Sequence, residues 1–482
     1  STTFLGHQGW MVRGARACVL IDPLLQPTFG ALHALGYQVF PPRVIDWATF
    51  PAVDAVLLSH EHDDHFDLPS LVLLDRAIPI YLSARSSRAG RGVLTDLGFT
   101  VRPWLPGVPI RVGDLEITGL AGDHVGTVTS DEWDTLPYLV RSVDGHGSLF
   151  SMVDLPLTDR HVAWAAERAT RPGLVTWTNN ALDWSHMTSY LDERTEGNQQ
   201  AFVRMGVGHK LITTQWGPPA AMLMCAGGFS FHGDKAWLNH RVFCVDNEEV
   251  CAQLTRLYKK EKFVAAVPGQ TFVMQAGKLK AIEADTPFLR ATPREGWPSR
   301  RRADDGPAPD YEPATGERTL APDQVAVLEA GLAMLAGAIV GGPLWRGLHS
   351  VLEPEGDGRR ITFAFALRDG DRRRVYEYVS TDCAFVASAD PDPEAHVVAG
   401  LECWASDLTA VLAGELAPIA LSFARARLWN ALAGRMSFAI FEELYRVSHP
   451  LRCPAVYTRL YARAAAAVAG TTPTVRAATP PA

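Results

Sequence analysis

The segment Ala55-Val56-Leu57-Leu58-Ser59-His60-Glu61-His62-Asp63-Asp64-His65 places three histidines and an aspartate directly after four apolar residues. Such a short, continuous apolar run is typical of a strand buried on both faces. Alternate residues at the end of a strand point to the same side, so His60 and His62 can bind one metal ion. Asp64 and His65 follow in the loop and can face a second ion. Imidazole and carboxylate ligands suit zinc, iron and manganese.

The competing interpretation of this segment is a polar loop whose histidines have no shared role. Histidine makes up only 15 of 482 residues, so the spacing His-x-His-x-Asp-His seldom arises by chance. A metal site is therefore the hypothesis that the sequence favours. A purely structural metal is a weaker hypothesis, because a closed structural site needs no second group of ligands.

The overall composition limits the classes of partner. The formal net charge of −8 argues against a nucleic-acid-binding protein, which needs a basic face to replace phosphate counterions. The most apolar stretch, 325–340, is interrupted by Glu329, so we expect no membrane span. The seven cysteines include no Cys-x-x-Cys pair, and the first residues show no signal-peptide pattern. These features favour a cytoplasmic location with free thiols.

The distribution of strand and helix patterns predicts an α/β chain with two folded parts. In residues 1–285, strand-like runs and two Gly-containing hairpin signals alternate with helical patterns, which predicts sheets covered by helices. Residues 286–319 are rich in proline and charge and are expected to form a linker. A C-terminal α+β domain is expected over 320–469, including a helix from Pro418 to Leu432. Residues 470–482 are expected to form a flexible tail.

On its metal motif, the chain resembles the metallo-β-lactamase superfamily over residues 4–285. The resemblance implies an αβ/βα sandwich with a dinuclear metal site at one edge of the sheets. It further implies that Asp22 supports the metal loop from the second shell. His124 would complete the first metal site, and Asp154 would bridge the two ions. Each of the three residues alone is a weak signal, but His124 and Asp154 come after the main motif in the order that the family has, which strengthens their assignment.

The last family ligand is the point at which this sequence departs from the superfamily pattern. The family segment reads apolar-Pro-x-His, whereas this chain has glutamine at Gln270 after Val267-Pro268-Gly269. Gln270 could replace the histidine or act from the second shell. His232, in a glycine-rich loop, is the residue expected to supply the missing metal ligand, and His186 is a weaker candidate. The claims of His7 and His240 are weaker still.

Three segments resemble the branch that contains CMP-sialic acid hydroxylase and the diiron oxygenases, among them the platensimycin and platencin diterpenoid hydroxylase. They are 7–23, 226–229 and 264–272. The resemblance implies a diiron monooxygenase that uses dioxygen to hydroxylate a carbon of an apolar intermediate, such as a diterpenoid or acyl thioester, in natural product biosynthesis. No Rieske Cys-x-His pair is present, so an external electron donor is expected. The alternative is a dizinc hydrolase of a lactone, thioester or phosphoester.

Aromatic side chains near the expected site are candidates for contact with an apolar small-molecule substrate. These candidates are Trp184, His186, Phe229 and Phe231, although aromatic residues are equally common in a core.

The second part of the chain resembles sterol-carrier-like domains. The resemblance rests on an expected strand that is followed first by Ser406-Asp407-Leu408, at the start of a helix, and then by Gly414-Glu415-Leu416, in a turn. That resemblance implies a pocket for an apolar ligand. The alternative is a domain that only packs on the first and shapes its entrance.

Overall fold

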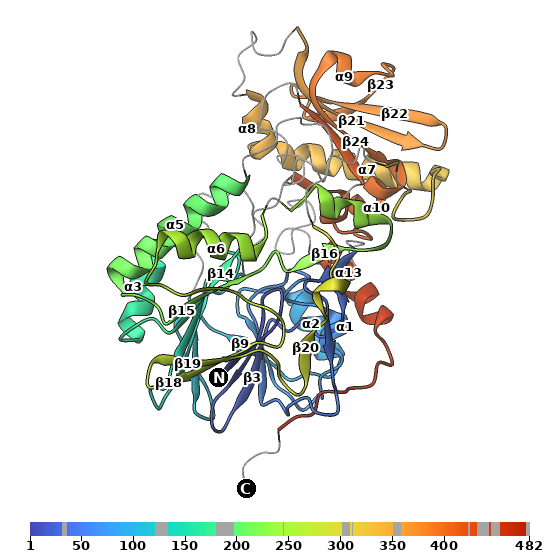
Figure 1. Cartoon of the computed structure of the whole chain (residues 1–482). Coiled ribbons are helices and arrows are strands. Elements are labelled where there is room, and N and C mark those ends of the chain that lie inside the picture. The colour runs from blue at the N-terminus through green and yellow to red at the C-terminus, as the bar shows by residue number, and fades with distance from the viewer. Residues whose placement is uncertain are drawn as a thin grey trace.

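The computed structural model describes residues 1–30, 36–120, 134–179, 197–243, 245–300, 309–310, 312–349, 358–422, 425–430, 443–444 and 454–478. Two large β-sheets lie face to face with helices on their outer sides, and a third sheet with its own helices lies beyond one end (Figure 1). The predicted fold class, an α/β sandwich followed by a C-terminal α+β domain, is confirmed.

The first sheet of the sandwich has eight strands. In spatial order they are β19 (Lys278–Glu283), β18 (Thr271–Gln275), β1 (Thr2–Gly6), β2 (Gly9–Arg13), β3 (Cys18–Ile21), β7 (Ala55–Leu58), β8 (Ile80–Ser83) and β9 (Val101–Trp104). From β3 to β9 the strands are parallel. The apolar run before the metal motif is strand β7, and all four of its residues are buried, as its composition predicts.

The second sheet has seven strands. In spatial order they are β10 (Ile110–Val112), β11 (Leu115–Gly119), β12 (Tyr138–Ser142), β13 (Ser148–Ser151), β14 (Leu174–Thr178), β15 (Ala221–Cys225) and β17 (Phe263–Ala265). Both hairpins expected from Gly-containing turns are present, as β10–β11 and β12–β13. The last four strands are parallel, so their carboxyl ends share one edge.

Side chains that alternate in direction along the strands form three apolar layers, one between the two sheets and one on the outer face of each sheet. Leu57 points into the core between the two sheets, whereas its neighbour Leu58 points to the outer face of the first sheet. That outer face is covered by α1 (Leu68–Leu71), α2 (Arg88–Asp96) and α13 (Pro454–Ala467). The outer face of the second sheet is covered by α3 (Asp159–Arg168), α5 (Gly197–Gln215) and α6 (Asn247–Leu257).

Two small sheets and two short 3-10 helices complete the sandwich. The small sheets are β16 (Phe229–Phe231) with β5 (Tyr37–Val39) and β4 (Thr28–Phe29), and β20 (Leu289–Ala291) with β6 (Arg43–Ile45). The 3-10 helices are η2 (Gly233–His240) and η3 (Arg294–Gly296). Strands β16, β5 and β4 form an aromatic cluster with Phe243, which lies just after η2.

The C-terminal part contains a five-stranded sheet that packs on its own helices. The strands, in spatial order, are β23 (Ala384–Ser388), β22 (Arg372–Val379), β21 (Arg360–Asp369), β24 (Val397–Trp404) and β25 (Ala426–Asn430). The helices are α7 (Pro322–Ile339), α8 (Pro343–His349), α9 (Pro393–His396), α10 (Ala405–Ala413) and α11 (Ile419–Ser422). The strands β21 and β24 are parallel neighbours at the centre.

The helix predicted from Pro418 to Leu432 is wrong over most of its length. Among the residues that the structure describes in this range, only α11 is helical, and Ala426–Asn430 instead forms β25, antiparallel to β24. Leu428 and Trp429 are both buried in this strand. Pairing with β24 satisfies the backbone and buries these side chains, which overrides the helix preference of the alanine and arginine residues around them.

One helix of the described chain, α7, is long and apolar enough to cross a membrane by length and composition alone, with a mean hydropathy of 1.2. This is a weak indication. The stripe Leu328, Leu332, Leu335 and Ile339 packs into the core beneath the C-terminal sheet, as in a helix of a globular domain.

Parts of the expected linker and tail are folded against the sandwich. Arg300, in the linker, donates to the carbonyl oxygen of Phe229 at 3.0 Å and lies over the ring of Phe40. Residues 471–478 do not form the expected free tail. The N–H of Val475 donates to the carbonyl oxygen of Leu73 at 2.8 Å, and Val475 is buried. The Val475 side chain packs in the same apolar cluster as α1, and this burial offsets the entropy lost when residues 471–478 become ordered.

Candidate metal centre

The candidate metal centre lies where the carboxyl ends of parallel strands meet. The loop after β7 supplies His60, Asp64 and His65, and the segment after β13 supplies Asp154. The turn between β1 and β2 approaches from the neighbouring strands and supplies His7. These side chains come from segments far apart in the sequence, and the sandwich brings them together at this edge.

The first ligand cluster consists of His60, His65 and Asp154. One ligand atom from each lies within 4.8 Å of the others. The Asp154 Oδ2 atom is 3.0 Å from His65 Nε2 and 3.5 Å from His60 Nε2. Both imidazoles are fully buried. Two imidazole nitrogens and one carboxylate oxygen form a donor set that suits iron, zinc or manganese.

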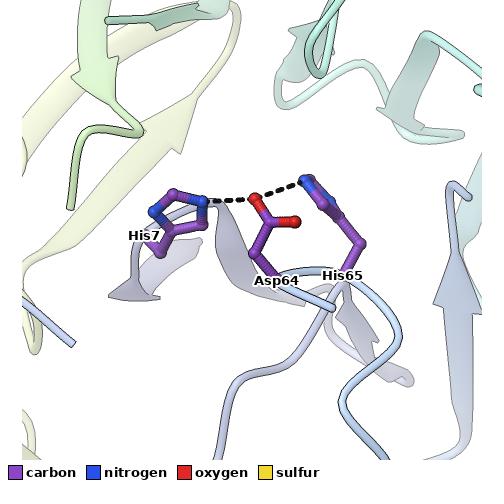
Figure 2. Close-up of side chains that lie close together, drawn as sticks. All are labelled: His7, Asp64 and His65. Carbon is purple, nitrogen blue, oxygen red and sulfur yellow. Dashed lines mark hydrogen bonds and ion pairs between the residues drawn. The ribbon is translucent and has the colours of Figure 1, made fainter. Parts of the chain in front are cut away.

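The second ligand cluster consists of His7, Asp64 and His65. Figure 2 shows the Asp64 carboxylate between the two imidazoles. Its Oδ2 atom is 2.7 Å from His7 Nε2 and 3.3 Å from His65 Nε2. Because His65 belongs to both clusters, the two possible ion positions are neighbours. His65 Nε2 has one lone pair and can bind only one of the two ions, so the Asp64 and Asp154 carboxylates on either side of it are the groups that can connect the two positions.

The hydrogen bonds behind the cluster determine which imidazole nitrogens face it. Ser59 donates both its N–H and its hydroxyl to the Asp22 carboxylate, each at 2.7 Å. The Ser59 hydroxyl has one proton, so in its 3.0 Å contact with His60 the Nδ1–H donates to the serine oxygen. His65 Nδ1–H donates to Asp22 Oδ2 at 2.9 Å. The Nε2 lone pairs of His60 and His65 are therefore directed at the cluster.

The charges in the cluster favour a cation. Burial alone would raise the pKa of Asp64, but His65 and His7 hold it well below its ordinary value. Burial also raises the pKa of Asp154, and His65 more than reverses that shift. For His65, burial lowers the pKa, while Asp64, Asp22 and Asp154 raise it well above the ordinary value. A metal ion would compete with that proton for the same carboxylates and imidazole, so the residues present fit a metal centre.

His7 and Gln8 are the site residues that sequence reasoning undervalued or missed. Both are buried in the β1–β2 turn. The Gln8 amide donates to Asp154 Oδ1 at 2.5 Å, so it fixes the other oxygen of the shared carboxylate. The available signal was a pair of polar residues between two glycines and two apolar strands. His7 has a φ of 53°, a left-handed conformation that is uncommon for residues other than glycine.

The remaining motif residues are placed differently. The ring of His62 is 4.4 Å from that of His60, but His62 belongs to neither cluster among the described residues. His232 is exposed, and its N–H donates to the carbonyl oxygen of Gly36. It lies outside both clusters, so the structure does not support it as the missing ligand. The Gln270 amide oxygen accepts from Val267 N–H at 3.0 Å, within its own turn.

The expected substrate contacts are only partly described. Phe229 and Phe231 are buried in the aromatic cluster around β16, where the Phe229 ring is 6.0 Å from that of His7. His124, Trp184 and His186 lie outside the described residues. The first cluster thus has three described ligands, and the place of His124 beside it stays a prediction.

Comparison with known proteins supports the family resemblance. Residues 18–213 match the family model of the beta-lactamase superfamily domain. An uncharacterized protein of Mycobacterium tuberculosis, Rv0906, is 32% identical over 74 residues, which are 15% of this chain and 20% of that protein. The alignment therefore spans about a fifth of this relative's length.

Solved structures with similar folds include two classes of enzyme. One is a possible metal-dependent hydrolase from Veillonella parvula, with 17% identity and a TM-score of 0.40 over 56% of this chain and 97% of that one. Another is CmlA, a diiron β-hydroxylase from Streptomyces venezuelae, with 16% identity and a TM-score of 0.37 over 55% of this chain and 52% of that one. These likenesses concern the fold and carry no conclusion about the reaction.

Proposed function

We propose that this protein is a dinuclear iron monooxygenase that hydroxylates a carbon of an apolar biosynthetic intermediate. His60, His65 and Asp154 would hold one ion, and His7, Asp64 and His65 would surround the other. His124 and His62 would complete the first position. The proposal rests on the two neighbouring clusters and on the departure at Gln270, where the superfamily's histidine is missing.

When two iron ions are bound and reduced, they supply the redox chemistry that inserts one oxygen atom of dioxygen into a C–H bond. An external donor would supply two electrons, and the second oxygen atom would leave as water. The protein's residues hold the centre in place. Asp22 and Ser59 direct the imidazoles, and Gln8 fixes the shared carboxylate Asp154.

The observation that favours an oxygenase over a hydrolase is the buried aromatic cluster that packs beside His7. The rings of Phe29 and Phe229 lie 5.6 Å and 6.0 Å from the His7 ring, and Tyr37 packs against both phenylalanines. A dry aromatic surface protects a reactive oxidising centre from side reactions with water. A hydrolase must instead bring water to its metals.

A cavity of about 270 Å³ lies close to the β1–β2 turn. It borders Ala226, whose N–H donates to the His7 carbonyl oxygen at 2.9 Å. Its lining combines apolar side chains, among them Phe40 and Trp297, with four charged ones, which are Asp246, Glu248, Arg294 and Arg300. We assign the non-reacting part of the substrate to this cavity.

Oxygen consumption by iron-loaded protein tests the proposal. Protein loaded with iron and reduced chemically under anaerobic conditions should take up dioxygen when mixed with oxygenated buffer, and its iron should become oxidised. A His60→Ala/His62→Ala variant treated in the same way is the control, because it should retain too little iron to react.

The alternative function, a dizinc hydrolase, predicts a different result. Zinc-loaded protein would cleave members of a lactone, thioester or phosphoester panel under strict anaerobiosis, with solvent oxygen entering the product. That outcome, together with no oxygen uptake by the iron form, would replace the oxygenase by the hydrolase.

A further inference from the structure

The residue between the first two histidines of the motif points away from the metal clusters. Glu61 is 6% exposed, and its carboxylate contacts Ser87 and Tyr461, which belong to neither metal cluster. A buried carboxylate needs several donors to offset the loss of water. Two of them come from Ser87, whose N–H and hydroxyl both donate to Glu61, the hydroxyl at 2.8 Å.

The third donor comes from the C-terminal helix. The Tyr461 hydroxyl, on α13, donates to Glu61 Oε2 at 2.8 Å, although 400 positions separate the two residues. The Tyr461 ring packs at 5.5 Å against Phe66, directly after the metal motif. One side chain thus contacts the metal loop at two places, one polar and one apolar.

The segment that carries Tyr461 is attached firmly to the sandwich. Ala464 of α13 and Val475 are both buried in the apolar layer beneath α1 and α2. The strand-like residues after α13 bridge to both Val53 and Leu74. The chain therefore returns from its C-terminal sheet to cover the back of the metal loop.

The space around Glu61 leaves its carboxylate little freedom. A Cβ added at Gly90, in the first turn of α2, would lie 2.6 Å from the Glu61 carboxylate. Ser87, Gly90 and Tyr461 all contact this carboxylate or lie within a Cβ's reach of it, so it has little room to move. Since Glu61 is bonded directly to both flanking histidines in sequence, its position constrains theirs.

We infer that Tyr461 is a positioning residue for the metal centre: through Glu61, it holds the loop that carries His60 and His62 in the conformation that binds metal. The inference rests on the proposed metal centre and does not depend on whether that centre is an oxygenase or a hydrolase. It assigns a role in the metal site to a segment beyond the C-terminal sheet.

Metal affinity measured by chelator competition on the full chain tests this inference. Tyr461→Phe removes only the hydroxyl, and it should weaken metal binding about 10- to 100-fold, as loss of an outer-shell partner does. Tyr258→Phe, a half-buried tyrosine of the other sheet's helix layer, is the matched control and should bind metal like the unchanged protein. The melting temperatures of the two metal-free variants should be similar.

Two further variants separate positioning from a general loss of stability. Gly90→Ala adds a methyl group 2.6 Å from the same carboxylate, which must then move, so it should also weaken metal binding. Combined with Glu61→Gln, Tyr461→Phe should add no further loss, because the two changes break one interaction. Unchanged affinity in Tyr461→Phe would overturn the inference. Failure of the unchanged protein to bind any metal would instead overturn the proposed function.

Discussion

Asp22 decides which nitrogen of His65 faces the metal cluster. Its Oδ2 atom accepts from His65 Nδ1 and from the Ser59 hydroxyl, while Oδ1 accepts from the Ser59 N–H. Asp22 itself has a φ of 46°, in the left-handed region that aspartate and asparagine tolerate better than most residues. A single carboxylate therefore fixes the turn after β3 and the tautomer of a ligand that belongs to both clusters.

Replacing Asp22 by asparagine should impair metal binding while keeping the fold. Asparagine suits the left-handed backbone, but either orientation of its amide places an N–H against an N–H of Ser59 or His65. The His65 proton would then favour Nε2, where the metal needs a lone pair. We expect metal affinity to fall about 10- to 100-fold, measured by chelator competition. Unchanged affinity would mean that Asp22 does not orient His65.

His7 provides the sharpest test of the second cluster. His7→Ala removes one ligand of that cluster and leaves His60 and Asp154 in place, so the metal content should fall from about two ions per chain to about one. His232→Ala is the control. Its exposed side chain lies outside both clusters, and we expect its metal content to be unchanged. The reverse result would restore His232 as the missing ligand.

At the scale of elements, strands with a strong pattern were predictable and long-range pairings were not. Strand β7 and the hairpin β10–β11 follow directly from apolar runs and turn residues. His7 was undervalued because its contact with Asp64, 57 positions away, depends on how the β1–β2 turn packs beside the metal loop, which no local pattern reports. Strand β25 was predicted as helix for the same reason, since only its pairing with β24 makes it a strand.

The packing of β24 against β25 predicts a large cost for a small substitution. A Cβ added at Gly400 would lie 2.0 Å from Trp429 Cζ2 and 2.5 Å from the Ala364 carbonyl oxygen. Gly400→Ala should lower the free energy of unfolding by about 1–3 kcal/mol or more, as overpacking does. The measurement is chemical denaturation followed by circular dichroism.

A matched glycine in an open position should respond in the opposite direction. Gly337 lies on the exposed side of α7, and a Cβ added there meets nothing within 4 Å. Gly337→Ala should stabilise the helix by up to about 1 kcal/mol, because alanine has the higher helix propensity. Equal destabilisation by both substitutions would contradict the packing described for β24 and β25.

At the scale of the whole molecule, we propose that the sandwich and the C-terminal sheet are separate folding units, with the segment after 454 belonging to the sandwich. Among the residues that the structure describes, the apolar cluster of the C-terminal sheet shares no residue with the four clusters of the sandwich, although Ile419 of α11 packs against the aromatic cluster around β16. Arg300 lies within the expected linker, yet it is hydrogen-bonded to Phe229 of the sandwich. The boundary between the sandwich and the linker could therefore not be placed from composition alone.

Calorimetry with and without metal tests this division. Metal at 100 times its dissociation constant stabilises the unit that binds it by about 2.7 kcal/mol. We therefore expect two unfolding transitions. Removal of the metal by a chelator should lower the transition temperature of the sandwich and leave that of the C-terminal sheet unchanged. A single transition that shifts as a whole would show that the two parts unfold together.

The central claim is that two neighbouring ions lie in two clusters that meet at His65, which binds one of them through Nε2. Anomalous diffraction from a crystal of the metal-loaded protein, recorded at the absorption edge of the bound metal, tests it most directly. We expect two peaks, one bounded by His60, His65 and Asp154, and the other by His7, Asp64 and His65. A single peak, or a second peak at His232 instead of His7, would contradict the account.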